Sequence, residues 1–326
     1  MRHWVTRLRL QCLLGALLAL SVSIPTLAQT WPDRPIKVLV PTPPGAGPDV
    51  VCRRVTQKLS EALGQSVTVE NRPGASGHVA GEVASKSVAD GYTLLCGVSS
   101  TFVTTPHVMT KLSYDPVKEL APISFIGKSH MVLVASPTVP ADDLPSLISW
   151  IKANPGKVSF ASPGVASSQH LAMEVFKSRA GLDMAHVPYN NSLAAPDLAS
   201  GRVQLMIDAY APMLPYIQDK KVKLIAIASS SPLAEFPNAA LTNQTIADFG
   251  VTGWAALFAP KATAQAIIDR LSTEVTKILD MKDVKEQMAI LGMITQQGSP
   301  EVTRNLIQTE FDYWGRVVKA ANIRLE

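Results

Sequence analysis

The fold is decided near the beginning of the chain by residues 38–49, which read VLVPTPPGAGPD. A β-branched strand runs directly into a Gly/Pro loop, and the loop opens a helix. The first N–H groups of a helix have no partner inside it, and the helix dipole favours negative charge at that end. We therefore expect an anion-binding loop at Pro44, Gly45, Ala46 and Gly47, with Asp49 in the same site. The alternative is a plain strand–helix turn in which Asp49 is an N-cap-like residue.

Outward from this loop, short β-branched runs alternate with helical patterns, as is typical of an α/β protein with largely parallel sheets. Strands are predicted at 36–40, 66–70, 92–97, 131–136, 158–161, 203–208, 224–228 and 254–260. Helices are predicted at 49–63, 77–86, 144–153, 168–180 and 194–200, and the pattern after residue 260 is wholly helical, at 265–279, 283–291 and 300–321. The length exceeds what one core usually serves, so we predict two lobes with a cleft between them. Domain 1 is predicted to comprise residues 29–130 plus 254–326 and domain 2 residues 131–253, with hinges near 128–132 and 253–256.

Residues 1–28 are predicted to be a secretory signal peptide. Arg2, Arg7 and Arg9 precede an apolar stretch that is too short to cross a bilayer, and Thr26-Leu27-Ala28 suits a cleavage site. Cleavage after Ala28 leaves 298 of the 326 residues and, with three arginines gone, lowers the formal charge from +4 to +1. Without a cluster of Lys and Arg, the sequence gives no electrostatic support for binding nucleic acid or for a polybasic contact with a membrane surface.

The three cysteines are expected to be neither lipidated nor paired, with a disulfide as the alternative. Leu10-Gln11 before Cys12 is unlike a lipobox, so we expect no lipid anchor. In an oxidising compartment Cys52 and Cys96 could keep a disulfide. We favour two separate buried thiols, because sequence alone does not bring their Cβ atoms to bonding distance.

Three further groups of polar residues follow predicted strands. Ser99 and Ser100 lie at the carboxyl end of a strand, where open α/β sheets bind ligands, although ordinary turn chemistry explains them equally well. The second predicted lobe repeats the strand, small-residue loop and helix pattern at Ser162, Gly164, Ala166 and Ser167, and a polar turn follows at Tyr189, Asn190 and Asn191. Asp208 ends another strand. The loop at 71–77 is expected to be structural.

Catalytic and cofactor motifs are missing from the sequence. The histidines lack HxxxH or HExxH spacing, the cysteines lack CxxC, and there is no GxSxG. The glycines at 45–47 imitate a dinucleotide fingerprint, but Val50 takes the third glycine position and a secreted protein has little access to NAD. We expect the protein to bind no cofactor and no metal and not to be an enzyme. A secreted enzyme with Asp49 or Asp208 as base remains the alternative.

These loops, in this order, resemble the extracytoplasmic solute-binding proteins of tripartite tricarboxylate transporters, often called the Bug family. The resemblance extends from residue 31 to about residue 320. The segments that carry it are WPDRPIKVLVPTPPG, VTVENRPGASG, ADGYTLLCG, LSYDPVKELAPIS, IKANPGKVSFAS, the HL of SSQHLAMEVF, GLDMAHVPY, SGRVQLMID and TGWAALFAP.

The resemblance implies a two-lobed, type II-like periplasmic binding protein that closes on a small organic carboxylate and delivers it to the membrane subunits of a transporter. In such proteins, backbone amides, hydroxyls and ordered waters of the strand-to-helix loops hold the carboxylate. The implied site residues are Pro44 to Gly47, Ser162 to Ser167, Tyr189, Asn190, Asn191 and Asp208. We expect a monomer. A sensory protein that presents the same ligand to a receptor is a further alternative.

The chain departs from the family pattern in its loops. Ala46 and Ala166 stand where glycine is common, Pro163 is added, and Asn190-Asn191 replaces a usual Lys-Gly pair. With Asn190 in place of a cation, a second charged carboxylate is less favoured. We therefore hypothesise a ligand with one well-held carboxylate and a polar or apolar far end.

Overall fold

The computed structural model describes residues 31–189, 193–229, 231–233, 235–247 and 249–321. Residues 34–321 belong to one compact unit, and residues 31–33, which include a cis Trp31–Pro32 peptide bond, belong to the segment before it. The predicted signal peptide therefore lies outside the described residues. Within the compact unit, strands form one continuous mixed sheet in the order β2-β1-β3-β9-β4-β7-β5-β6, and β8 and β10 also pair with β4.

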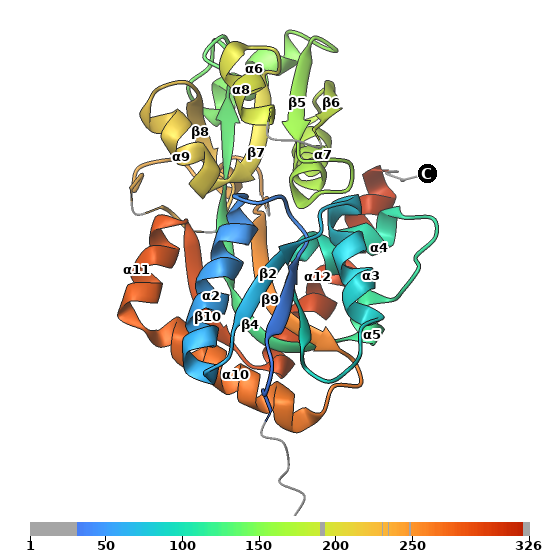
Figure 1. The fold of residues 1–326 in the computed structure, drawn as a ribbon. Helices are drawn as coiled ribbons and strands as arrows, with labels where there is room; N and C mark the ends of the chain where they lie inside the picture. The colour runs from blue at the N-terminus through green and yellow to red at the C-terminus, as the bar shows by residue number, and fades with distance from the viewer. Residues whose placement is uncertain (1–30, 190–192, 230, 234, 248, 322–326) are drawn as a thin grey trace, which may run out of the picture. The chain divides into compact units, whose positions relative to one another are not determined.

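The unit has two α/β halves, which Figure 1 shows as the blue and orange half and the green and yellow half. The first half contains β1 (Ile36–Val40), β2 (Val67–Asn71), β3 (Thr93–Val98), β9 (Thr252–Pro260) and β10 (Met293–Gly298). The second half contains β5 (Val158–Ser162), β6 (Met184–Pro188), β7 (Leu205–Ala209) and β8 (Lys223–Ile227). The two predicted lobes of α/β structure are confirmed.

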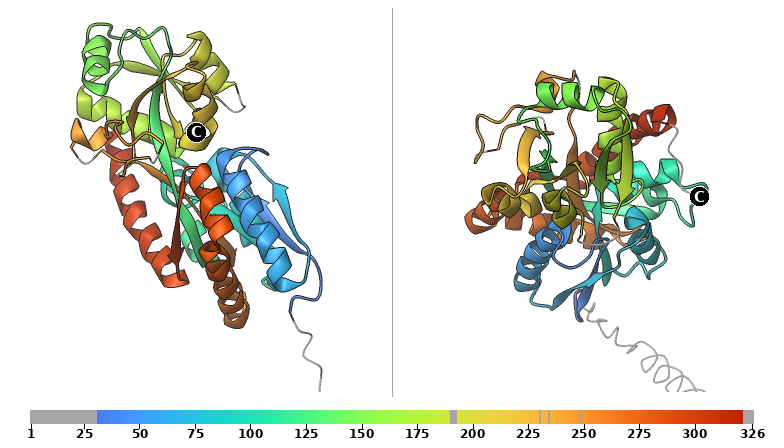
Figure 2. Two further views of the ribbon diagram at one scale, coloured as in Figure 1. Left: turned by 90° about the vertical axis from the view of Figure 1, so that its left-hand side faces the viewer. Right: turned by 90° about the horizontal axis from the view of Figure 1, so that it is seen from above.

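One strand, β4 (Leu120–Ala135), belongs to both halves. Its first part pairs with β9 as far as the His130–Thr252 pair, and its second part pairs with β7 from the Met131–Ala209 pair onward. Figure 2 shows this long green strand running from one half into the other. Nearly every residue of β4 is buried, because sheet neighbours and helices cover it.

Helices cover the sheets because their apolar residues recur at helical spacing. In α10, for example, Ile268, Leu271, Val275 and Ile278 are buried on one face. The first half carries α2 (Gly47–Leu63), α3 (His78–Ser85), α4 (Thr105–Val108), α5 (Pro116–Glu119), α10 (Gln265–Asp280), α11 (Lys282–Ile290) and α12 (Pro300–Ala321), with the short turns η1 (Ala75–Gly77) and η2 (Ser100–Thr104), the latter π-helical. The second half carries α6 (Leu144–Lys152), α7 (Ser168–Ala180), α8 (Ala194–Ser200) and α9 (Tyr210–Gln218), and the turn η3 (Thr242–Gln244) follows β8.

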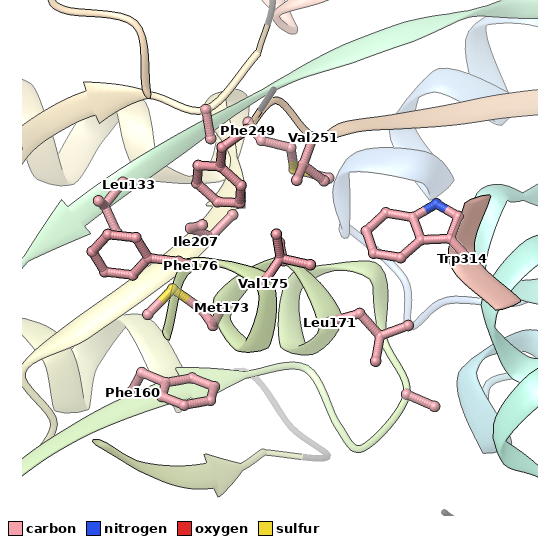
Figure 3. Close-up of a cluster of buried hydrophobic side chains, with 14 of the residues drawn as sticks. Leu133, Phe160, Leu171, Met173, Val175, Phe176, Ile207, Phe249, Val251 and Trp314 are labelled. Atoms are coloured by element: carbon pink, nitrogen blue, oxygen red, sulfur yellow. The ribbon is translucent and has the colours of Figure 1, made fainter. Parts of the chain in front are cut away.

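The largest hydrophobic core cluster runs through both halves. Around α7 it contains Leu171, Met173, Val175 and Phe176, and the ring of Phe176 lies beside that of Phe249 of the second half (Figure 3). Trp314 of α12 belongs to the same cluster and lies toward Leu171 in the figure. The halves are therefore in apolar contact as well as joined by the chain.

Several sequence-based expectations need correction. The sheet is mixed rather than largely parallel, because β4 and β9 run antiparallel to their neighbours. The C-terminal region is not wholly helical, since β10 adds an antiparallel strand beside β4. Finally, Cys52 and Cys96 are joined in a disulfide with a Cα–Cα distance of 6.2 Å, so the preference for separate thiols was wrong, although both residues are buried as expected.

Candidate functional site

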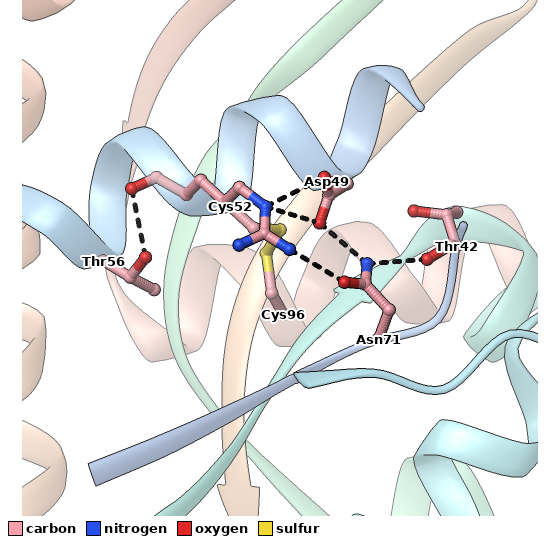
Figure 4. Close-up of a disulfide and its surroundings, with 7 residues drawn as sticks. Thr42, Asp49, Cys52, Thr56, Asn71 and Cys96 are labelled. Atoms are coloured by element: carbon pink, nitrogen blue, oxygen red, sulfur yellow. Dashed lines mark hydrogen bonds and ion pairs between the residues drawn. A yellow bond between two sulfur atoms is a disulfide. The ribbon is translucent and has the colours of Figure 1, made fainter. Parts of the chain in front are cut away.

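The first-half loop is held from beneath by the carboxylate of Asp49. This buried group accepts a hydrogen bond from Gly45 N at 2.8 Å. It also accepts hydrogen bonds from Asn71 Nδ2 at 2.7 Å and from Arg53 Nε at 3.0 Å (Figure 4). Asn71 Nδ2 also donates to Thr42 O, which links the loop to the end of β2. Burial raises the pKa of Asp49, but these hydrogen bonds outweigh it and leave the pKa below its usual value. Asp49 is thus an ionised residue that fixes the loop.

The helix α2 begins two residues earlier than predicted, so Ala46 is its N-cap and Asp49 lies in the first turn. The N-cap-like role for Asp49 is therefore wrong. Gly45 adopts a φ of 81°, which glycine tolerates, whereas Ala46 has ordinary extended angles and no strain from its methyl group.

Fewer amides of this loop are free than the sequence suggests. Gly45 N–H donates to the Asp49 carboxylate, Ala46 N–H donates to Pro43 O, and the prolines have no N–H. Among the described residues, the N–H groups of Gly47 and Asp49 have no acceptor. They lie at the positive end of a 17-residue helix, where an anion is favoured.

The second-half loop between β5 and α7 is also tightly braced. Ser167 caps α7 by accepting from His170 N at 3.2 Å, and its hydroxyl donates to Gly164 O at 2.8 Å. Ala166 N–H donates to His170 Nδ1 at 3.1 Å, and Ala166 has a φ of 67°. This left-handed backbone explains why glycine suits the position. Within the described part of the chain, the amides left without an acceptor are those of Val165, Ser168 and Gln169.

A stack of rings supports this loop. His170 and His186 are 3.8 Å apart between ring centroids, and Phe160 stacks on His186 at 5.0 Å. His186 Nε2 lies 2.7 Å from Ser162 Oγ, so both histidines hold loop atoms. Burial lowers the pKa of His170 to about 3 and that of His186 to about 4, so both rings are neutral at neutral pH. The sequence reasoning missed this support, although the HL segment marked one of the rings.

Ser99 and Ser100, both predicted site residues, lie where the two halves meet. Ser99 Oγ is 3.1 Å from Ser168 Oγ, and Ser100 Oγ donates to Ser76 O at 2.9 Å. Ser76 in turn donates to Val165 O at 3.0 Å. The loop at 71–77, expected to be structural within the first half, therefore also reaches the second half.

The end of β7 connects the two helix N-termini. Asp208 Oδ1 accepts from Gln169 Nε2 at 3.1 Å and from Ala209 N at 2.8 Å. On the other side, a Cβ placed on Gly47 would lie 4.0 Å from Ala209 Cβ. The first turn of α7, the end of β7 and the first turn of α2 are thus contiguous. Burial raises the pKa of Asp208.

Tyr189 follows β6 beside the second-half loop. Its N–H donates to Ser162 O at 2.8 Å, and its hydroxyl donates to Asp197 Oδ2 at 2.8 Å. Asn190 and Asn191 lie outside the described residues. Of the predicted site residues, the structure therefore brings together the loops at 44–49, 162–169 and 208–209, with Tyr189 bonded to the second of them.

Two observations bear on metal and membrane. Among the described residues, no group of three or more His, Cys, Asp or Glu side chains is placed to hold a metal ion. Every helix in the described part of the chain is too short or too polar to span a bilayer.

Two α/β halves joined through a shared strand, each presenting a helix N-terminus at their junction, define the class of two-lobed periplasmic binding proteins. Residues 51–323 match the family described as the tripartite tricarboxylate transporter family receptor, and the chain belongs to this family.

Known proteins with similar sequence or structure agree with this assignment. Protein BugT of Bordetella pertussis is 34% identical over 322 residues, covering 98% of this chain and 99% of its own. An R. palustris protein solved with adipate has a TM-score of 0.86 and 27% identity, covering 90% of this chain and 99% of that one. MatC from Rhodopseudomonas palustris, solved with bound malate, has a TM-score of 0.82 and 28% identity, covering 88% of this chain and 100% of that one.

Proposed function

We propose that this protein is a periplasmic binding protein that captures a small organic carboxylate and delivers it to the membrane subunits of a tripartite tricarboxylate-type transporter. The observation that carries the proposal is the contact between the first turns of α2 and α7 through Asp208 and Ala209. Unpaired amides at both helix ends suit an anion that both halves can hold. The adipate and malate of the related structures are carboxylates of this kind.

The chemistry of the site favours binding through amides rather than through a cation. Arg53, the basic residue closest in sequence to the first loop, is committed to Asp49 and Asn71. Hydrogen bonds to a charged acceptor are about twice as strong as neutral ones, so several amides hold a carboxylate without an arginine. The ligand in this proposal has one carboxylate at the free amides of Gly47, Asp49, Ser168 and Gln169, and a polar or apolar far end.

We propose that the protein acts without catalysis. An acid–base pair of Asp49 and Asp208 is disfavoured because the hydrogen bonds that Asp49 accepts stabilise its ionised form, lower its pKa and so oppose its taking up a proton. A sensory role uses the same site, and the transporter family favours uptake.

The lobe division is part of the same proposal: residues 29–130 plus 254–326, and residues 131–253. The change of partner in β4 between His130 and Met131 supports the first boundary. We also propose cleavage after Ala28, a periplasmic location and a monomeric state, on the basis of the sequence and the family.

A thermal-shift screen of mono-, di-, tri- and aromatic carboxylates, with adipate and malate included, tests the function. A ligand at 100 times its Kd should stabilise the protein by about 2.7 kcal/mol. A panel in which no carboxylate raises the Tm contradicts the proposal, and one in which tricarboxylates outrank all monocarboxylates contradicts the single-carboxylate ligand. Mass spectrometry of the tightest ligand after long incubation tests the absence of catalysis, and gel filtration tests the monomer.

A further inference from the structure

Hydroxyl groups of the first half bind backbone carbonyls of the second-half loop. Thr104 Oγ1 donates to Ala166 O at 2.9 Å, and Ser76 Oγ donates to Val165 O at 3.0 Å. Both carbonyls belong to the turn between β5 and α7 that carries the candidate site. The two halves therefore share the hydrogen bonds that give this loop its shape.

Ala166 shows why these bonds matter. Its N–H points to His170 beneath the loop, and its carbonyl points to Thr104 across the junction. Ala166 and Thr104 are fully buried, so neither group has water as a replacement partner. A left-handed backbone is unfavourable for alanine, so the surroundings must hold it there.

Ser76 is itself held in place by the first half. It has a φ of 49°, and its carbonyl accepts a hydrogen bond from Ser100 Oγ at 2.9 Å. The hydroxyl that reaches Val165 is thus fixed by its own loop and by η2, the π-helical turn that also carries Thr104. One turn of the first half therefore supplies or supports both contacts.

We propose that Thr104 and Ser76 are positioning residues, which hold the second-half loop in its ligand-binding shape only while the two halves are in contact. When the halves separate, the carbonyls of Val165 and Ala166 lose these donors, and the left-handed alanine relaxes. The loop amides are then arranged for a carboxylate by closure itself. The inference rests on the proposed function in so far as this loop forms a wall of the binding site.

Hydrogen exchange measured by mass spectrometry on the purified, ligand-free protein tests the inference. In Thr104→Val, the hydrogen-bonded amides of Ala166, Ser167 and His170, followed in a peptide covering residues 163–170, should exchange about tenfold faster than in the wild type, because a buried carbonyl of the same loop loses its donor. Thr104→Ser keeps the hydroxyl and should restore slow exchange. Thr56→Val is the matched control, because Thr56 is a buried threonine whose hydroxyl donates within its own helix, to Arg53 O.

Wild-type exchange in Thr104→Val, or equally fast exchange in Thr104→Val and Thr104→Ser, overturns the proposal. If Thr104→Val fails to fold, Ser76→Ala at a half-buried position decides in its place, with faster exchange in residues 163–170 supporting the proposal and wild-type exchange refuting it. No ligand is present in this experiment. A carboxylate panel without a hit would therefore overturn the proposed function while leaving the exchange result to judge the loop.

Discussion

Acidification from pH 7 to pH 5 is expected to destabilise the protein through its stacked histidines. His170 and His186 have pKa values lowered by burial to about 3 and about 4, whereas an unfolded histidine titrates near 6.5. Between pH 7 and pH 5 the unfolded chain therefore takes up protons that the folded protein refuses. A folded pKa below the unfolded one means stability that is present above pH 6.5 and is lost as the pH falls toward the folded values.

The size of the effect follows from the two pKa values. At pH 5, protonation of one histidine with an unfolded pKa near 6.5 stabilises the unfolded state by about 2 kcal/mol, relative to a folded state in which the same histidine stays neutral. We take about 2 kcal/mol for His170 and about 1 kcal/mol for the less buried His186, or about 3 kcal/mol together. Burial also lowers the pKa of His78, His107 and His130, which adds to the loss in the same direction.

Urea unfolding at pH 7 and pH 5 measures this loss, and a matched variant assigns it. His170→Asn combined with His186→Gln keeps hydrogen-bonding groups near the loop but removes both titrating rings. The variant should lose about 3 kcal/mol less than the wild type over the same pH interval. Equal losses in the two proteins would refute the assignment to the stack, since carboxylates and the other histidines are unchanged between them.

Three further predictions concern the first half. Cys52→Ala should lower the free energy of unfolding by about 4 kcal/mol, because the disulfide with Cys96 closes a loop of 44 residues. A reductant should destabilise the wild type but not the variant, and a wild-type unfolding curve that a reductant leaves unchanged would contradict the pairing. Gly45→Ala should cost about 1 kcal/mol in urea unfolding, because the position has a φ of 81° although it has open space for a methyl group. Arg53→Met should lower the free energy of unfolding by about 1–2 kcal/mol, a value reduced by solvent screening, because it leaves the buried carboxylate of Asp49 without its cation. The control Arg54→Met, at the exposed neighbour, should stay within about 0.5 kcal/mol of the wild type. Equal effects of the two arginine variants would argue against the loop-fixing carboxylate.

Local patterns predicted the elements that are built from local signals. Strand β1 was predicted at its observed bounds, as were helices α7, α8 and α12, since Pro, Ser or Gly in the sequence marks at least one end of each. The strand-to-helix loops were also predictable, because Gly and Pro mark them in the sequence.

Elements that depend on distant partners could not be read in this way. The first part of β4 contains Pro122 and Gly127 and is buried without alternation, so it lacks a strand signal. Strand β10 contains mostly polar residues toward its carboxyl end, so its sequence gives no strand pattern. Helix α9 contains Pro215, a residue that argues against a helix when only the sequence is known. The antiparallel direction of β4 and the disulfide likewise depend on the path of the chain in space.

The site shows the same division. The sequence indicated which loops form the candidate site, but it could not show that the Gly45 amide donates to Asp49 and the Ala166 amide to His170. It also missed Thr104, which lies one helical turn beyond Ser100 and bonds a residue 62 positions away. Such contacts follow from packing and not from spacing.

The shared strand β4 also bears on how such proteins diversify. The chain enters the second half at Met131 and returns to the first at Thr252, and these two points lie side by side: Ala228 N donates to Met131 O, Val251 N donates to Ala228 O, and Thr252 pairs with His130. The second half is therefore an insertion whose two ends sit next to each other. We expect that a relative's corresponding segment can be joined at these positions, which would give recombination a route to new ligand preferences, as long as that segment also matches the apolar contacts that the two halves share.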